Sequence, residues 1–471
     1  MFRRKRRFCK TKKRGGSQRE PPLFGGYKLA KGLAVWKEGN HNSVVLDADN
    51  AFWGIINNKD CNSDTIVPRS ILSLYERYKE KLDKELYDFR FSQELSAIYI
   101  DPTDRCNANC PYCYIPARIR QNGRSMTCAE LRFILEKIKQ YFTGKQRKPV
   151  IIFHASEPLL AKEAVFEQIR KYGRHFKFGL QTNAVLLEKP DIAFLKRYRV
   201  GVGISLDSSK ALINNRLRVT ARGDGNFARA VRAIEWFDGY EGLNIITTVT
   251  KFNVEGLSGL VKFLHAKRVP CVLCNPVRLT QKNSRPLKPQ VGALTRHFLD
   301  AVNCAMRLSL NSRHKIIIGN FSNVILAIVS PAARRLMCDI SPCGGGRCFF
   351  TITASGDMIP CGEFIGLKGF AGGNIFKDPI SKAMSSRPFK KIRARVVENI
   401  GECDICLFRN ICGAPCPAEL HALGDMHQKS AFCEFYKEII KYAFRIISEG
   451  RENVCLRTEG LKDLRYVYSI G

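Results

Sequence analysis

Three cysteines lie close together in the segment IDPTDRCNANCPYCY, where Cys106, Cys110 and Cys113 have the spacing CxxxCxxC. Three thiolates at this spacing can bind one face of a cuboidal iron–sulfur cluster, which leaves the fourth iron without a nearby protein ligand. A catalytic metal site keeps such an open position, whereas a structural site is closed. The alternative is a structural zinc loop, which three cysteines alone do not exclude.

Eight further cysteines lie between residues 343 and 433, enough for two complete four-cysteine sites: Cys343, Cys348, Cys361, Cys403, Cys406, Cys412, Cys416 and Cys433. From spacing alone, a double zinc ribbon is the alternative. The chain shows no secretory signal, and no apolar run approaches the ~20 residues of a membrane helix. We therefore expect a cytoplasmic protein whose clustered cysteines bind metal rather than form disulfides.

The elements that position the first cysteine group begin at Ser96. Six short apolar strands alternate with amphipathic helices, at SAIYID, VIIFH, FKFGLQTN, VGVGISLD, NIITTVT and CVLCNPV. This alternation predicts an α/β fold with a parallel sheet, right-handed crossovers and the form of a barrel or partial barrel. In such folds the chemistry lies at the C-terminal ends of the strands. The cysteine triad follows the first strand, which favours a catalytic cluster over a zinc loop.

Charge and composition divide the rest of the chain. Residues 1–22 carry much of the formal net charge of +34 and are predicted to be a basic disordered tail, with an electrostatic arm as the alternative. Residues 23–95 are predicted to form a small α+β unit, with strand–turn–strand between Leu33 and Asn57 and then a helix. The barrel is expected over residues 96–320. Residues 338–450 are expected to form a domain held by metal and ended by a closing helix.

The segment around the cysteine triad resembles the radical S-adenosylmethionine (radical SAM) superfamily. The family hallmark is a CxxxCx(aromatic)C loop after the first strand of a partial (β/α)6, TIM-like barrel, and Tyr112 is the aromatic residue here. The resemblance implies that Cys106, Cys110 and Cys113 hold a catalytic 4Fe-4S cluster whose free iron binds S-adenosyl-L-methionine (SAM). It also implies reductive cleavage of SAM to methionine and a 5′-deoxyadenosyl radical, which removes a hydrogen atom from the substrate.

The same resemblance implies SAM contacts at the strand ends. The family has a Gly-Gly-Glu-Pro-like turn after the second strand, where this chain has His154-Ala155-Ser156-Glu157-Pro158. We expect Glu157 to bind the SAM ammonium group. The other expected cofactor contacts are Tyr112, Ser156, Asn183, Ser205, Asp207 and Arg216. For Ser205, Asp207 and Arg216 the alternative is strand-end capping and surface salt bridging.

The C-terminal cysteines resemble the SPASM domain, which carries auxiliary clusters in many radical SAM maturases. Gly356 and Cys361 match the first part of its signature, and the CxxCxxxxxCxxxC run with a last cysteine matches the rest. The resemblance implies two auxiliary 4Fe-4S clusters, and so three clusters in all. Their ligand sets would be Cys343, Cys348, Cys361 and Cys416 for the first, and Cys403, Cys406, Cys412 and Cys433 for the second. Cys338 lies close enough in sequence to exchange with Cys343.

Two enzymatic functions compete within this class. A maturase of a ribosomally made precursor peptide would form a thioether or carbon–carbon cross-link, whereas an anaerobic sulfatase maturase would make formylglycine. In sulfatase maturases an Asp follows the cysteine that matches Cys361, but here Gly362 and Glu363 follow it. The predicted unit at 23–95 resembles the leader-peptide-binding domain of peptide maturases, which binds an added β-strand. These features favour the peptide maturase.

Partners follow from the same reasoning. We expect a precursor peptide as substrate, an electron donor such as flavodoxin or ferredoxin, and no membrane. A basic iron–sulfur protein that binds nucleic acid is the alternative from another class, since the net charge would supply phosphate affinity. It is disfavoured because nucleic-acid binding does not account for Glu157-Pro158 after the second strand.

Overall fold

The computed structural model describes residues 33–38, 42–50, 52–58, 67–145, 148–334, 338–413 and 416–457. The basic tail expected at residues 1–22 lies outside the described residues, as does part of the unit expected at 23–95.

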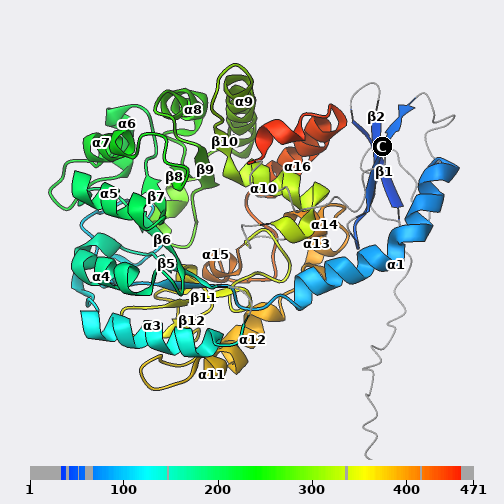
Figure 1. Ribbon diagram of the computed structural model, residues 1–471. Helices are drawn as coiled ribbons and strands as arrows, with labels where there is room; N and C mark the ends of the chain where they lie inside the picture. Colours follow the sequence, from blue (N-terminus) through cyan, green and yellow to red (C-terminus); the bar gives the residue numbers. More distant parts are fainter. Residues whose placement is uncertain are drawn as a thin grey trace, which may run out of the picture.

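Within the described residues, the main sheet has nine strands in the order β10-β9-β8-β7-β6-β5-β4-β11-β12 (Figure 1). Strands β4 to β9 are the six that the sequence predicted, and they pair in parallel in chain order. Their bounds, with those of β10, are Ala97–Ile100, Val150–Phe153, Lys177–Thr182, Gly201–Ser205, Leu243–Val249, Cys271–Pro276 and Ile317–Ile318. The α/β fold with a partial parallel barrel is therefore confirmed.

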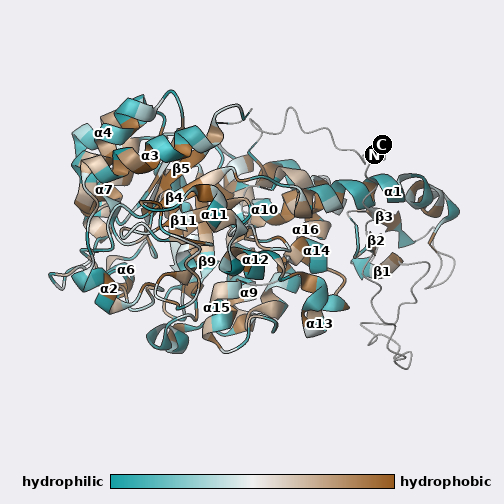
Figure 2. Ribbon diagram, turned by 90° about the horizontal axis from the view of Figure 1, so that it is seen from below, coloured by the Kyte–Doolittle hydropathy of each residue, from teal (hydrophilic) through white to brown (hydrophobic). Residues whose placement is uncertain are grey.

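Helices cross over between these strands. They are α2 (Ala117–Asn122), α3 (Cys128–Phe142), α4 (Lys162–Tyr172), α5 (Lys189–Arg197), α6 (Ala211–Leu217), α7 (Phe227–Phe237), α8 (Leu257–Ala266) and α9 (Val291–Leu310). Figure 2 shows teal and brown residues mixed along α3, α4 and α7, as expected for helices with one buried face. Helix α3 begins with a capping box, in which the Glu130 N–H donates to Thr127 Oγ1 (3.2 Å) and the Thr127 N–H donates to Glu130 Oε2 (2.8 Å).

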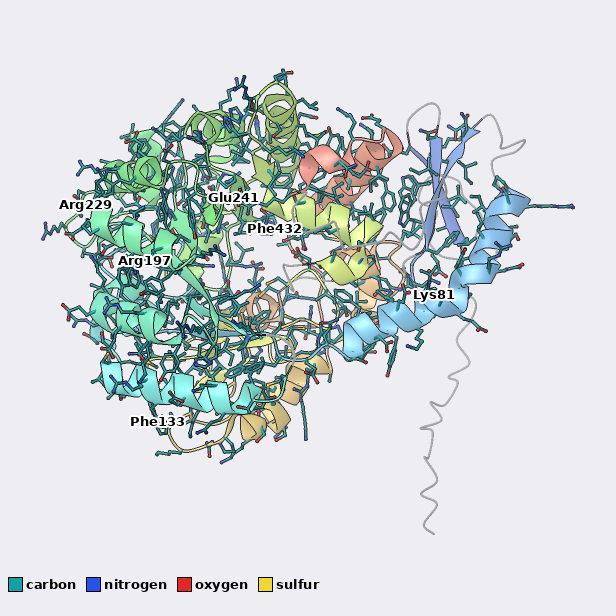
Figure 3. All side chains as sticks on the ribbon, viewed as in Figure 1. Lys81, Phe133, Arg197, Arg229, Glu241 and Phe432 are labelled. Carbon is teal, nitrogen blue, oxygen red and sulfur yellow. The ribbon has the colours of Figure 1, made fainter. Side chains whose placement is uncertain are left out.

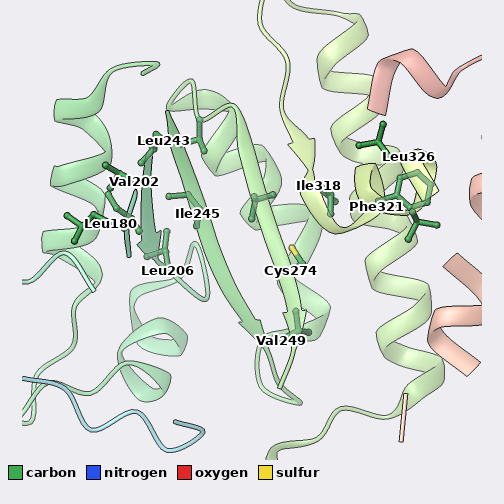
Figure 4. Close-up of a cluster of buried hydrophobic side chains, with 14 of the residues drawn as sticks. Leu180, Val202, Leu206, Leu243, Ile245, Val249, Cys274, Ile318, Phe321 and Leu326 are labelled. Atoms are coloured by element: carbon green, nitrogen blue, oxygen red, sulfur yellow. The ribbon is translucent and has the colours of Figure 1, made fainter. Parts of the chain in front are cut away.

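The core lies between the sheet and its helices, and it continues into α10 (Gly319–Val329). Figure 4 shows side chains of β7, β8 and β9 packed together, with Ile318, Phe321 and Leu326 beside them. All residues from Phe321 to Val329 are buried, so the longest apolar run of the sequence is a core helix. No helix in the described part of the chain is long and apolar enough to cross a membrane.

The C-terminal region extends the same sheet. Strand β11 (Phe349–Ile352) pairs in parallel with β4, and β12 (Met358–Ile359) pairs with β11 in antiparallel orientation. The remaining helices are α11 (Ile380–Ser385), α12 (Arg387–Arg393), α13 (Gly401–Asp404), α14 (Arg409–Cys412), α15 (Pro417–Ala422) and α16 (Cys433–Ser448). The predicted closing helix is thus α16, and Gly450 follows it with φ of +67°.

The N-terminal elements form a separate three-stranded sheet, β1-β2-β3, with the long helix α1 (Arg69–Phe91). The sequence predicted two strands between Leu33 and Asn57, whereas the described residues form three there. Their bounds are β1 Leu33–Glu38, β2 Asn42–Asp47 and β3 Trp53–Asn57. The break occurs at Asp47, whose carboxylate accepts hydrogen bonds from the Asp49 N–H (2.8 Å) and the Asn50 side chain (2.9 Å). Asp and Asn stabilise turns through such local bonds.

The N-terminal unit packs against the C-terminal region. Arg90 of α1 donates two hydrogen bonds to Glu398, at 2.7 and 2.8 Å. The Trp36 ring meets Phe408 and Phe444 edge-on, at centroid distances of 5.4 and 5.1 Å. Figure 3 shows α1, with Lys81 labelled, beside β1 and β2 at one side of the molecule. The unit is therefore built into the core, and its removal would expose apolar surface.

Candidate active site and cluster-binding cysteines

A cavity of about 390 Å³ lies at the C-terminal ends of the barrel strands. The loop after β4 brings Cys106, Cys110 and Cys113 to its wall, together with Tyr112. Ser156, Asn183 and Ser205 reach it from the ends of β5, β6 and β7. The structure thus gathers these residues, predicted from separate segments, around one space.

Two arginines lie beside the cysteine triad. Burial raises the pKa of Cys106 to about 12 and that of Cys110 to about 11, while the Arg218 guanidinium acts in the opposite direction on Cys110. Burial also raises the pKa of Cys113, which Arg120 opposes. Arg120 Nη1 also donates to the carbonyl of Ala108 (2.9 Å) and so fixes the loop. Metal ligation uses the thiolate form, and buried cations offset that charge, so the donor set fits an iron–sulfur cluster.

Asp207 lies behind the cavity wall and organises it. Its carboxylate is fully buried, pairs with Arg218 and accepts a hydrogen bond from the Tyr112 hydroxyl. The Thr248 N–H also donates to it (2.9 Å). The carboxylate therefore joins the cysteine loop to the ends of β7 and β8.

Arg218, not Arg216, is the arginine that lines the cavity. Arg216 is exposed, and its guanidinium carbon lies 3.8 Å from the centroid of the Phe252 ring. Both arginines stand in the run RLR at the end of α6, and its sequence alone does not show which one turns inward. The signal that was overlooked is Asp207, a buried strand-end carboxylate that needs a cation nearby.

Glu157 is fully buried and bonded within the protein. Its Oε1 accepts hydrogen bonds from the Thr182 hydroxyl (2.7 Å) and the Leu159 N–H (3.2 Å), and its Oε2 accepts one from the Asn183 N–H (2.8 Å). Burial raises its pKa to about 7. The carboxylate is not part of the cavity wall, so in this structure it ties the end of β5 to the end of β6.

The turn before Glu157 has an unusual backbone. Ala155 and Ser156 have φ values of +59° and +45°, a left-handed conformation that glycine adopts more readily than other residues. Both residues line the cavity. Ser156 Oγ donates to the carbonyl of Asp104 (2.7 Å), which joins the turn to the cysteine loop.

Asn183 and Ser205 are held by a shared amide. Asn226 Nδ2 donates to the backbone carbonyls of Asn183 (2.8 Å) and Ser205 (3.0 Å). Asn183 Nδ2 in turn donates to Asn107 Oδ1 in the cysteine loop (2.7 Å). The cavity wall is therefore one hydrogen-bonded network across the ends of β6 and β7.

A second cavity, of about 180 Å³, adjoins the first on the side of the C-terminal region. The cysteines that line it are Cys338, Cys343, Cys361, Cys412 and Cys416. Cys338 keeps accessible surface inside this space, yet burial by the surrounding protein raises its pKa well above the ordinary value. Cys338 thus joins Cys343, Cys361 and Cys416 around the same cavity.

Cys348 has a different environment. Its side chain is 2% exposed and does not line either cavity. Its carbonyl accepts a hydrogen bond from the Ser96 N–H (2.9 Å), because β11 begins at the next residue and pairs with β4. Strands β11 and β12, with Cys343, Cys348 and Cys361 on either side of them, form what we call the cysteine hairpin. Its pairing with β4 fixes the position of Cys348.

Of the last cysteine group, Cys412 lines both cavities, whereas Cys403, Cys406 and Cys433 lie outside them. Cys403 is close enough to Cys433 and Cys406 for their charges to raise its pKa, which burial raises most, to about 11. The exposed residue Ile405 stands between Cys403 and Cys406. Among the described residues, no three His, Cys, Asp or Glu side chains converge at the spacing of a single bound ion.

Polar residues missed from the sequence line both cavities: Tyr114, His154, Gln181, Arg278 and Glu363. Arg278, after β9, lies 3.5 Å from carboxylate oxygens of both Glu363 and Glu419. The second carboxylate oxygen of Glu363 is buried without a partner, as is Nδ1 of His154. Burial lowers the pKa of His154 to about 4. The one sequence signal for these cavity residues is Arg278, a charged residue two positions after the end of β9.

Comparison with known families agrees with this geometry. Residues 100–264 match the radical SAM superfamily, and residues 343–407 match the iron–sulfur cluster-binding SPASM domain. An uncharacterized protein of Archaeoglobus fulgidus is 40% identical over 426 residues, which are 90% of this chain and 97% of that protein. The chain belongs to the radical SAM superfamily and carries a C-terminal SPASM domain.

More distant relatives include enzymes with known activities. A cysteine-type anaerobic sulfatase-maturating enzyme of Clostridium perfringens is 24% identical over 76% of this chain and 99% of its own length. Two solved structures share the fold. The enzyme anSMEcpe with bound AdoMet and the Cp18Cys peptide has a TM-score of 0.65 at 20% identity, covering 76% of this chain and 99% of that one. Streptococcus suis SuiB bound to precursor peptide SuiA has a TM-score of 0.56 at 13% identity, covering 84% and 97%.

Proposed function

We propose that this protein is a radical SAM peptide maturase that installs a thioether or carbon–carbon cross-link in a ribosomally made precursor peptide. The observation that carries the proposal is the pair of adjoining cavities, one lined by the CxxxCxxC triad and the other by SPASM cysteines. A peptide residue at their junction would meet a hydrogen-abstracting site on one side and an electron-accepting site on the other.

Three 4Fe-4S clusters are proposed. Cys106, Cys110 and Cys113 would hold the first, whose bound SAM supplies the 5′-deoxyadenosyl radical. The cavity favours Cys338, Cys343, Cys361 and Cys416 for the second, with Cys338 in place of Cys348. Cys412 also lines this cavity, but we keep it in the third set with Cys403 and Cys406, as the resemblance to the SPASM domain implies. Cys403, Cys406, Cys412 and Cys433 remain the proposed set for the third.

The residues of the cavity wall would bind and orient SAM. Arg218, held by Asp207, presents a cation to the SAM carboxylate, and a charge-assisted bond of this kind contributes about 1.5–3 kcal/mol. The turn at Ala155 and Ser156 presents backbone groups to the SAM ammonium. Glu157 holds that turn through its bonds to β6. Asn183 and Ser205 complete the polar wall.

The junction of the cavities would accommodate the peptide. His154 and Glu363 each have a buried polar atom there without a hydrogen-bond partner. Buried polar atoms normally have one, and polar groups of the peptide would supply it. Structures of fold relatives bound to the Cp18Cys peptide and to the precursor SuiA support a peptide substrate. We propose that a leader segment docks on the unit at residues 23–95 by adding a strand to its sheet, whose edge strands are β1 and β3.

A sulfatase-maturase activity is the second candidate, favoured by the likeness to the Clostridium perfringens enzyme over 99% of that enzyme's length. Against it stands the residue after Cys361, which is Gly362 rather than Asp. The closest carboxylate along the chain belongs to Glu363, and it is engaged by Arg278.

Co-production of the protein with a precursor peptide encoded beside its gene, followed by mass spectrometry of the peptide, tests the proposal. A cross-link lowers the peptide mass by two hydrogens. Formylglycine in a sulfatase peptide, with neighbouring peptides unchanged, would select the second candidate instead. Point variants are preferable to removal of residues 23–95, because the Arg90–Glu398 pair and the Trp36 contacts join that unit to the rest of the protein.

A further inference from the structure

Exposed cations are concentrated in α12 and in the segments that flank it along the chain. Between Ile365 and Val397 the chain has eight lysines and arginines but a single acidic residue, Asp378, which pairs with Lys382 (2.7 Å). Figure 2 shows α12 in teal. The exposed cations, which we call the basic surface, are Lys368, Lys377, Lys382, Arg387, Lys390 and Lys391.

The opposite face of α12 packs on the cysteine hairpin. Phe389 and Ile392 are fully buried, and Ile392 belongs to an apolar cluster against which Cys343, Cys361 and Cys416 pack. Arg393 Nη1 donates to the carbonyl of Gly346, between Cys343 and Cys348 (2.9 Å). A single helix, with a diameter of roughly 10 Å, therefore separates the basic surface from these cysteines.

We propose that the basic surface docks an acidic one-electron carrier protein of the flavodoxin or ferredoxin type. The proposal rests on the proposed function, because it requires a redox-active cluster at Cys343, Cys361 and Cys416. The exchange makes and breaks no bond: the reduced carrier loses one electron and the oxidised site gains it. The reverse transfer returns to the carrier the electron that oxidation of the substrate releases.

The charges of the two cysteine regions favour this location. The loop that holds Cys403 and Cys406 also exposes Glu402 and Asp404, which repel an acidic partner. The cations beside this loop, Lys429 and Lys437, are paired with Glu402 (2.5 Å) and Glu434 (3.1 Å). Between residues 365 and 397 the cations outnumber the acidic residues eight to one, because Asp378 is the one carboxylate there. An acidic carrier is therefore attracted to the basic surface and guided toward Cys343, Cys361 and Cys416.

Charge reversal tests the proposal. The triple variant Arg387→Glu, Lys390→Glu, Lys391→Glu is compared with a matched control, Arg174→Glu, Lys189→Glu, Lys210→Glu, whose residues are exposed around the barrel helices. Iron-loaded, oxidised enzyme is mixed anaerobically with reduced flavodoxin, and flavin oxidation is followed by stopped-flow absorbance. At low salt the first variant should slow the transfer at least ~10-fold while the control leaves it within about twofold. The difference should vanish near ~0.5 M salt.

Further measurements separate this proposal from the proposed function. Calorimetric binding of oxidised flavodoxin should weaken in the first variant only, whereas dithionite should reduce both variants as fast as the wild type. Failure of dithionite-reduced wild type to cleave SAM would refute the proposed function but not the docking result. Equal transfer rates in wild type and first variant would overturn the docking proposal. So would binding of a DNA duplex that the first variant loses while its flavodoxin kinetics stay unchanged.

Discussion

Arg218 donates two hydrogen bonds to Asp207, one from Nε to Oδ2 and one from Nη2 to Oδ1, each 3.0 Å long. The carboxylate is inaccessible to solvent and the guanidinium side chain is 10% exposed. The pair stands between the cysteine loop, through Tyr112, and the cavity that is proposed to bind SAM. It therefore links cluster binding, cofactor binding and stability in one contact.

Replacement of Arg218 should destabilise the protein much more than replacement of Arg216. Arg218→Met leaves Asp207 buried without its cation, and removal of one partner of a buried pair typically costs about 3–5 kcal/mol. Arg216→Met removes an exposed cation from the Phe252 ring, which costs about 1 kcal/mol or less. Urea unfolding measures both, and equal losses in the two variants would contradict the inward placement of Arg218.

Glycine should be tolerated better at Ala155 than at a helical alanine. Ala155 has φ of +59°, a conformation that costs an L-residue roughly 1–2 kcal/mol and glycine almost nothing. Ala233→Gly, in the interior of α7, is the matched control and should lose about 1 kcal/mol or more. We expect Ala155→Gly to be at least ~1 kcal/mol more stable than this control in thermal unfolding. If both variants lose the same free energy, the turn is not strained.

Cys338 and Cys348 should differ in their effect on iron content. Cys338 lines the cavity with Cys343, Cys361 and Cys416, whereas Cys348 is buried at the start of β11. After anaerobic reconstitution, Cys338→Ala should lose about four irons and four sulfides, and Cys348→Ala should keep the wild-type content. Iron and sulfide quantitation, with electron paramagnetic resonance of the reduced protein, distinguishes them. Loss of iron in Cys348→Ala alone would restore the set Cys343, Cys348, Cys361 and Cys416.

Glu157 should make stability depend on pH. Burial raises its pKa from 4.5 to about 7, so between these values the folded state binds a proton that the unfolded state lacks. This contribution is fully present below the unfolded pKa and is lost as pH rises through the folded one. From about pH 5.5 to pH 8 the wild type should lose roughly 2 kcal/mol relative to Glu157→Gln. Urea midpoints across this range provide the measurement, and parallel pH profiles would show that Glu157 is ionised throughout.

The sequence predicted what depends on local patterns. The CxxxCxxC triad is contiguous, and β4 to β9 are short apolar runs with helices between them, so both were recognisable from spacing and periodicity. The position of Cys348 was not, because it results from the pairing of β11 with β4 across 250 residues of chain. Arg216 and Arg218 are the same residue type two positions apart, so the sequence does not show which side chain is buried. The packing of the end of α6 near Asp207 decides that it is Arg218.

The residues at the junction of the cavities were missed for a related reason. His154, Arg278 and Glu363 follow β5, β9 and β12. Only His154 stands beside a motif, the turn that contains Glu157, and the motif gives His154 no role of its own. Their meeting is a property of the tertiary structure, since two domains share one sheet. The split of the second N-terminal strand was missed although the sequence carries a signal for it, since the turn-forming residues Asp47, Asp49 and Asn50 interrupt the apolar residues there.

The most direct test combines SAM cleavage with the fate of the peptide. Reconstituted, reduced enzyme is incubated anaerobically with SAM and a deuterated precursor peptide encoded beside its gene, and both products are analysed by mass spectrometry. We expect 5′-deoxyadenosine that carries deuterium from the peptide, together with a peptide that has lost two hydrogen isotopes per cross-link. A protein that holds zinc and forms no 5′-deoxyadenosine, or one that cleaves SAM while every such peptide stays unchanged, would contradict this expectation.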